Sequence, residues 1–195
     1  MAISLQKGQR ISLEKEAGTT LDKVVMGLGW DEAVREKKGF FGNKTVKEAI
    51  DLDASCLLFD ENKNLVDAVW FRQLGSRCGA VTHTGDNRTG EGDGDDEQII
   101  VDLSRLPASV KTLVFTVNSF TGESFADVPN AFCRIVNGRS NAEIARYDLS
   151  VQGAHTAQIM AKLYRHTDGW KMQALGENSS GRMFNEMMPQ ILPHL

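Results

Sequence analysis

Short apolar segments separated by turn residues occupy most of this chain, and they constrain its fold more than any other feature. The segments are rich in β-branched and aromatic residues, which suit the pleated, half-buried surface of a strand. In one of them Ile99, Val101 and Leu103 alternate with the polar residues Gln98 and Asp102, the period of two expected when one face of a strand is buried. Seven segments fit this description: residues 24–28, 52–59, 65–71, 98–103, 112–117, 131–136 and 143–148.

Two further apolar runs lie nearer the C-terminus, at residues 159–164 and 170–175. They flank the pair Asp168-Gly169, which is typical of hairpin turns because glycine tolerates the positive φ that such turns require. The chain therefore holds up to nine short strands, joined by connections rich in turn residues. This pattern predicts a mainly β fold, an antiparallel β-sandwich with a few short helices, one of them near the C-terminus.

A few segments do not follow the strand pattern. Residues 180–192 predict a short amphipathic helix, which Pro189 limits. Its apolar residues at helical spacing are Phe184, Met187, Met188 and Ile191. Residues 103–107 predict a short helical turn after a strand. Residues 31–51 are polar, basic and aperiodic, and we expect them to form a long surface loop.

Composition limits the classes of protein and of partner. The chain has 195 residues, 41% hydrophobic and 25% charged, which suits one globular domain over residues 1–195. It has no apolar run of about 18 residues that could span a membrane. Its first residues lack the apolar stretch of a secretory signal, so we expect a cytoplasmic protein. A net charge of −4 without a basic cluster disfavours nucleic acid and anionic membrane surfaces as partners.

The segment 83–97, with the sequence HTGDNRTGEGDGDDE, concentrates the acidity of the chain. Its six carboxylates and one arginine give a charge of about −5, whereas the whole chain carries −4, so the acidity is local. Two carboxylates about 4 Å apart repel by about 1 kcal/mol in water and by more at a lower dielectric constant. Such a loop is costly without a cation, and it therefore predicts a site for hard divalent ions, calcium above all.

Other interpretations of this loop are weaker. A phosphate-binding loop needs a lysine, and this segment has none. An EF-hand that starts at Asp93 would have Ser104 where the motif requires glutamate. A solvated acidic turn stays open as an interpretation, but the glycines between the carboxylates allow carbonyl and carboxylate oxygens to converge, as calcium requires. The lack of cysteine in the segment disfavours zinc and copper, whereas magnesium stays an alternative.

Carboxylates elsewhere in the chain are placed to complete the site. Asp51 and Asp53 lie on one face of a predicted strand, with Leu52 on the opposite face. Two like charges side by side on a strand are unfavourable unless something compensates them. Asp31, which follows the sequence GLGW, is a further candidate. Together with the loop, these residues supply enough oxygen ligands for two adjacent ions.

Four motifs of this chain closely resemble those of the TerD family, the bacterial tellurium-resistance and general-stress domain. They are GLGWD at 27–31, DLDAS at 51–55, the whole of 83–97 and ARYDL at 145–149. The resemblance covers nearly the whole chain, and the sequence GFFG at 39–42 makes it most similar to the TerZ branch of the family. The tail at 182–195 departs from what the family pattern matches.

The resemblance implies a β-sandwich that binds two calcium ions and has no established catalytic activity. It also links the chain to resistance to tellurite, phage and colicins, and to stress responses. Glu91 and Asp93 stand at less restricted positions of the family motif. The matching loop residues, with the two glycines as carbonyl donors, are Asp86, Asn87, Gly90, Gly92, Asp95, Asp96 and Glu97. With these, the predicted metal ligands also include Asp31, Asp51, Asp53 and Asp93.

The leading hypothesis is a non-enzymatic calcium-dependent scaffold or sensor whose ion-loaded loop binds other proteins of the stress or resistance system. The alternative is a metal-dependent hydrolase that uses a two-ion carboxylate site and His83 as general base. A third hypothesis is direct binding of tellurium by Cys56, Cys78 and Cys133, which their spacing does not support. Cys56 and Cys133 lie in apolar runs that are typical of core thiols.

Overall fold

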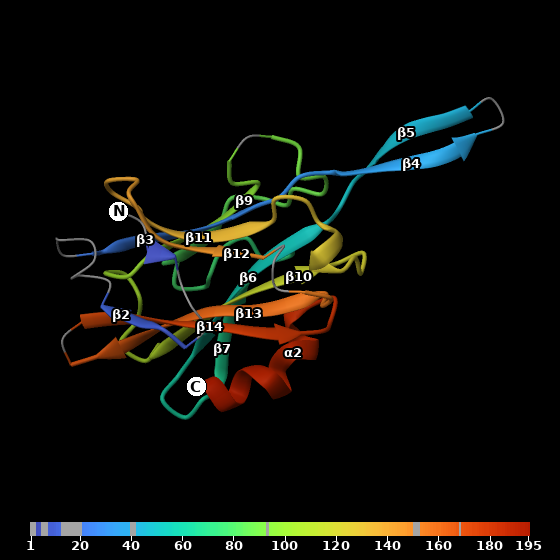
Figure 1. Cartoon of the computed structure of the whole chain (residues 1–195). Coiled ribbons are helices and arrows are strands. Elements are labelled where there is room, and N and C mark those ends of the chain that lie inside the picture. The colour runs from blue at the N-terminus through green and yellow to red at the C-terminus, as the bar shows by residue number, and fades with distance from the viewer. Residues whose placement is uncertain are drawn as a thin grey trace.

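The computed structural model describes residues 3–4, 8–12, 21–39, 42–92, 94–149, 153–167 and 169–195. Its strands form two six-stranded sheets, stacked as two layers, and one separate two-stranded sheet (Figure 1). The first sheet has the order β1 (Ile3–Ser4), β12 (Glu143–Asp148), β11 (Phe132–Asn137), β3 (Lys23–Gly29), β9 (Glu97–Asp102) and β8 (Val81–His83). The second has the order β2 (Arg10–Ser12), β14 (Gly169–Ser179), β13 (Ala157–His166), β10 (Thr112–Ser119), β6 (Leu52–Phe59) and β7 (Leu65–Val69).

Neighbouring strands in both sheets run antiparallel, except β1 and β12, which are parallel. The predicted antiparallel sandwich is therefore confirmed. The hairpin predicted around residues 165–169 is also confirmed, because β13 and β14 pair from Ala157↔Ser179 to His166↔Gly169. Strands β1, β2 and β8 were not predicted, since segments of two or three residues are too short to show a period.

The core lies between the two sheets, and β6 is buried on both of its faces. Leu52 and Cys56 pack between the sheets, whereas Leu57 and Phe59 belong to a second apolar cluster on the other face of β6. This double burial explains why the sequence of β6 is continuously apolar from Cys56 to Phe59 and does not alternate there.

The predicted C-terminal helix is confirmed as α2 (Phe184–Ile191), followed by the 3₁₀ turn η3 (Leu192–His194). Met187 and Ile191 are fully buried, and they pack with Leu57 and Phe59 on the outer face of the second sheet. The apolar side of the helix therefore covers that sheet. No helix among the described residues has the length and apolar character needed to cross a membrane.

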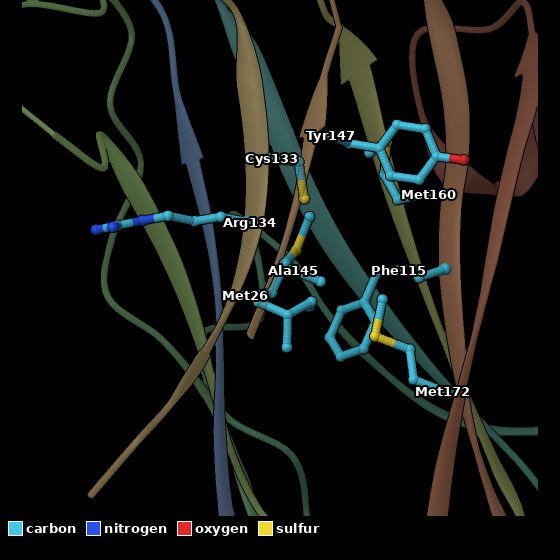
Figure 2. A pocket seen from close by; sticks show the side chains of 10 residues that line it. Met26, Phe115, Cys133, Arg134, Ala145, Tyr147, Met160 and Met172 are labelled. Atoms are coloured by element: carbon cyan, nitrogen blue, oxygen red, sulfur yellow. The ribbon is translucent and has the colours of Figure 1, made fainter. Parts of the chain in front are cut away.

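A cavity of about 10 Å³ lies in the core between the sheets. Figure 2 shows the sulfur-containing side chains of Met26, Cys133, Met160 and Met172 around it, whereas Arg134 extends away from it. Cys133 is a buried free thiol, as predicted. The volume is about that needed for one water molecule, so the sandwich is closely packed.

The end of β7 and the turn at residues 103–107 differ from the prediction, each for a local reason. β7 ends at Val69 because Trp70 and Gln73 exchange backbone hydrogen bonds of 3.1 and 2.9 Å and turn the chain. Residues 103–107 form turns and no helix; the first is closed by the Arg105 N–H, which donates to the Asp102 carbonyl at 3.2 Å. A second short 3₁₀ turn, η1 (Phe125–Asp127), was not predicted.

The prediction of a long surface loop over residues 31–51 is wrong. This segment forms the third sheet, a hairpin of β4 (Ala33–Gly39) and β5 (Gly42–Glu48) that projects from the sandwich (Figure 1). The seven residue pairs run in register from Ala33↔Glu48 to Gly39↔Gly42. A ribbon that stands away from the core has no face to bury, so its sequence shows no apolar period and does not reveal the strands. Phe40 and Phe41 lie outside the described residues.

Candidate metal centre

Glu97, the first residue of β9, anchors the acidic loop to the second sheet. β7 pairs with β6 only from Cys56 onward, so it leaves the earlier backbone of β6 uncovered. There Glu97 Oε2 accepts a hydrogen bond from the Ala54 N–H (2.8 Å), and Oε1 accepts one from the Asn87 N–H (3.2 Å). Because Glu97 is fully buried, these bonds hold the loop at the end of the sandwich where β6 begins.

His83 ends β8 beside Glu97, and its side chain is almost completely buried. Its Nδ1 accepts a hydrogen bond from the Gly85 N–H at 3.1 Å, and its Nε2 lies 3.3 Å from Glu97 Oε2. Both ring nitrogens therefore face groups of the protein. This arrangement supports the start of the loop and gives the imidazole no open side from which to activate a water molecule.

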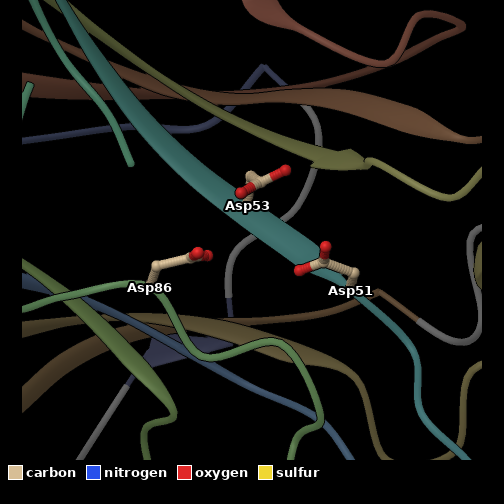
Figure 3. A group of neighbouring side chains, drawn as sticks. All are labelled: Asp51, Asp53 and Asp86. Atoms are coloured by element: carbon tan, nitrogen blue, oxygen red, sulfur yellow. The ribbon is translucent and has the colours of Figure 1, made fainter. Parts of the chain in front are cut away.

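Three aspartates from two distant segments converge at this end of the sandwich. Asp51 directly precedes β6, Asp53 is the second residue of that strand, and Asp86 reaches toward them from the loop (Figure 3). One carboxylate oxygen of each lies within 4.8 Å of the others. Asp53 is only 4% exposed, and Asp53 Oδ2 and Asp51 Oδ1 are buried without a hydrogen-bond partner. Buried polar atoms in this state are costly, so the cluster has the character of a binding site.

Burial dominates the electrostatics of this cluster. It raises the pKa of Asp53 from 3.8 to about 8, and the neighbouring charges of Glu97, Asp51 and Asp86 add to the rise. Burial also raises the pKa of Asp51, with the charge of Asp86 as the next cause. Without a cation, Asp53 therefore holds a proton at neutral pH, and a divalent ion that restores its ionised form must displace that proton.

The cluster opens into a cavity of about 220 Å³. Besides the three aspartates, its lining consists of Phe71, Arg88 and Phe120. The two rings meet edge to face, with their centroids 5.6 Å apart. The space is much larger than one ion, so water or other oxygen donors have room beside a cation held by the carboxylates.

A second group of predicted ligands lies around a separate cavity. Asp96 accepts hydrogen bonds from the Trp30 N–H and from the Asn87 Nδ2, both at 2.9 Å, and burial is the main cause that raises its pKa. Asp31 accepts one from Asn130 Nδ2 at 2.5 Å. The adjoining cavity of about 310 Å³ is lined by Asp31, Glu32, Val34, Lys47, Gly90, Glu91 and Gly92.

Gly90 shapes this second cavity through its backbone. Its φ is +68°, a region that favours glycine, and a Cβ atom there would lie 2.4 Å from Trp30 Nε1. The indole is itself fixed, because Trp30 Nε1 donates to the Ile50 carbonyl at 2.8 Å. The loop can therefore pass this close to Trp30 only with glycine at position 90.

Asp95 has a different environment from the other loop acids. Its side chain is 2% exposed and accepts hydrogen bonds from Arg134 Nε at 2.7 Å and Nη2 at 3.1 Å. Gln98 Nε2 donates a further bond at 2.9 Å. A bidentate pair with arginine neutralises this carboxylate, so its role in the structure is to tie the loop to β11.

The predicted site residues thus divide into groups. Asp51, Asp53 and Asp86 form one cluster, and Asp31, Gly90 and Gly92 line the second cavity. Asn87 and Asp96 bond to each other, and Asp95 and Glu97 bond to neighbouring protein groups. Asp93 lies outside the described residues. The sequence did not predict that Phe71, Arg88 and Phe120 form walls of the first cavity. Only Arg88 could have been noticed, because it is the one basic residue of the acidic loop.

The donors present fit a hard divalent cation. The first cluster offers only carboxylate oxygens, two of them buried and unpartnered, and the second cavity adds further carboxylates and the backbone of two glycines. Calcium binds such mixtures of carboxylate and carbonyl oxygens, whereas zinc prefers sulfur and nitrogen.

Fold and site together define a class of protein. The sequence profile of the TerD domain matches residues 1–189, and the chain therefore belongs to the TerD family. Among its relatives is the tellurium resistance protein TerZ of Serratia marcescens, 50% identical over 97% of each chain. The stress response protein SCP2 of Bacillus subtilis is 42% identical over 96% of this chain and 98% of its own.

A solved structure supports the fold independently. The crystal structure of a homologue of the telluride resistance protein TerD from Streptomyces coelicolor A3(2) superposes with a TM-score of 0.68. It covers 83% of this chain and 92% of its own, at 22% identity, so the likeness concerns the fold alone. The family predicted from the sequence motifs is confirmed, including its similarity to TerZ.

Proposed function

We propose that this protein of the tellurium-resistance and stress-response family binds calcium ions at the end of the sandwich where the acidic loop meets β6. The observation that carries the proposal is the convergence of Asp51, Asp53 and Asp86 within 4.8 Å, with two buried carboxylate oxygens that lack a partner. A divalent cation supplies the missing partner and offsets the mutual repulsion of the carboxylates.

A second ion is proposed at the separate cavity lined by Asp31, Gly90 and Gly92. The proposed ligands are Asp31 and the carbonyls of Gly90 and Gly92, three residues that line the cavity, together with Asp96, which neighbours Gly92. Calcium suits both places better than magnesium, because it accepts six to eight oxygens in flexible geometry, and both cavities leave room for water ligands. The ions would then be part of the folded loop.

We further propose that the calcium-loaded loop acts as a scaffold or sensor surface for other proteins of the stress-response system, without catalysis of its own. The names of the relatives, tellurium resistance protein and stress response protein, support this biological context. The alternative of a two-ion hydrolase is disfavoured because its candidate base, His83, is buried and has both ring nitrogens against protein groups.

Isothermal titration of chelator-treated protein tests the proposal. We expect calcium to bind at two sites and magnesium to bind more weakly. Asp53→Asn should weaken one site at least about tenfold, since even groups that only support a metal ligand change affinity by that factor. Binding of neither ion to the wild-type chain would refute the metal centre.

Glu61→Gln provides the matched control, because it removes one exposed carboxylate from the turn between β6 and β7. It should leave both affinities unchanged. If Glu61→Gln lowered the affinity as much as Asp53→Asn, general negative charge, and not the aspartate cluster, would account for the binding. Circular dichroism of each variant verifies that the fold is retained.

A further inference from the structure

Asn118, near the end of β10, has a buried side chain of which only the amide nitrogen forms hydrogen bonds. It is 1% exposed, and its Nδ2 donates hydrogen bonds to the Gly181 carbonyl and to Met187 Sδ, both at 3.0 Å. Its Oδ1 is buried and has no partner. The two acceptors on the Nδ2 side fix the orientation of the amide, because a carbonyl oxygen cannot donate to Gly181 or Met187. The unpartnered atom is therefore the oxygen.

The register of the second sheet places the side chain of Asn118 next to that of Asp53, one member of the aspartate cluster. Asn118 is the direct partner of Asp53 across the β6–β10 pair. Directly opposed residues project from the same face, with Cβ atoms about 4.5–5.5 Å apart. Three buried oxygens without partners thus belong to one end of these two strands: Asp51 Oδ1, Asp53 Oδ2 and Asn118 Oδ1.

The other side of Asn118 is occupied by the C-terminal segment. Gly181 precedes α2 and Met187 lies within it, fully buried. The helix has only eight residues, contains Pro189 and has no side-chain cap at its start, so it depends on docking for its stability. Phe184 adds a contact with Trp70 (5.2 Å between centroids), and Trp70 in turn contacts Phe71 of the aspartate cavity.

We propose that Asn118 is a further oxygen ligand of the cation at Asp51, Asp53 and Asp86, and that its amide nitrogen couples ion binding to the docking of α2. This inference rests on the proposed calcium site. An ion bound to Oδ1 fixes the amide plane and polarises its N–H groups, which strengthens the bonds to Gly181 and Met187. The C-terminal helix is then the part of the surface that changes with calcium.

Hydrogen exchange of the full chain, followed by mass spectrometry with calcium and with chelator, tests the coupling. In the wild type, calcium should slow exchange of the amides at 184–195 about tenfold. Asn118→Ala should abolish this difference and weaken one calcium site at least about tenfold. Asn118→Asp keeps an oxygen ligand but loses both N–H donors, so it should bind calcium and show no calcium-dependent protection of the helix.

Thr116→Val is the matched control. Thr116 lies two residues before Asn118 on β10, is fully buried and has an unpartnered hydroxyl, so the isosteric change should preserve both calcium binding and helix protection. The coupling is refuted if wild-type protein binds calcium but its helix exchanges at the same rate with and without it. The ligand role is refuted if Asn118→Ala binds calcium as the wild type does. A wild type that binds no calcium refutes the metal site itself.

Discussion

The stability of the ion-free protein should depend on pH through Asp53. The pKa of this carboxyl is about 8 in the folded chain, against 3.8 for an ordinary aspartate. Between these values the folded chain holds a proton at Asp53 that the unfolded chain has lost. The free energy of unfolding therefore falls as the pH rises through this range.

The expected effect is large enough to measure. Each pH unit of proton linkage corresponds to about 1.4 kcal/mol, so stability should fall by about 2.7 kcal/mol from pH 5 to pH 7. For a chain of this size, that loss lowers the thermal midpoint by about 5–10 °C. In Asp53→Asn the side chain has no proton to lose, so this share of the pH dependence should vanish.

Thermal unfolding of both proteins in chelator at pH 5, 6 and 7 gives the result directly. All other titrating groups contribute alike to the two curves, so the difference between them isolates Asp53. Saturating calcium should restore the wild type at pH 7, since the ion stabilises the ionised carboxylate. If the thermal midpoints of wild type and Asp53→Asn in chelator changed equally with pH, the claim that burial raises the pKa of Asp53 would be refuted.

Two further substitutions test how the loop is held. Gly90→Ala should destabilise the chain by about 2–4 kcal/mol in urea unfolding, because it adds strain at positive φ and displaces the Trp30 indole from its hydrogen bond. Gly94 has a φ of +95° and open space where a Cβ would lie, so Gly94→Ala should lower the free energy of unfolding by only about 1–2 kcal/mol. Equal losses for the two variants would contradict the contact between position 90 and Trp30. Arg134→Met should lower stability by about 3 kcal/mol, since it leaves the Asp95 charge buried and unpaired. Adding Asp95→Asn should recover most of that loss of stability. If it recovered none, Arg134 would stabilise the chain by a route other than its ion pair with Asp95.

The sandwich could be predicted because its strands bury at least one face. Alternation of Ile99, Val101 and Leu103 with polar residues identified β9, and the Asp168-Gly169 pair identified the last hairpin. The β4–β5 hairpin could not be predicted in this way. It projects from the core, so no burial requirement imposes a pattern on its sequence.

The metal centre could be predicted in composition but not in arrangement. The charge of residues 83–97 indicated cations, and the pair Asp51 and Asp53 indicated a second contributor from β6. Nothing in the sequence distinguished Asp95, which pairs with Arg134, from its neighbours. That pairing depends on a contact between residues 39 positions apart, and the sequence motif does not encode the register that creates it.

The sulfur-lined cavity between the sheets has a consequence for chemical durability. Met26, Cys133, Met160 and Met172 are the groups there that oxidants attack most readily, yet all four are almost fully covered. Burial also raises the pKa of the Cys133 thiol, which keeps it in its unreactive protonated form. Oxidative damage to these side chains therefore requires the two layers to separate first, so their survival in an oxidising cell is set by how seldom the sandwich opens.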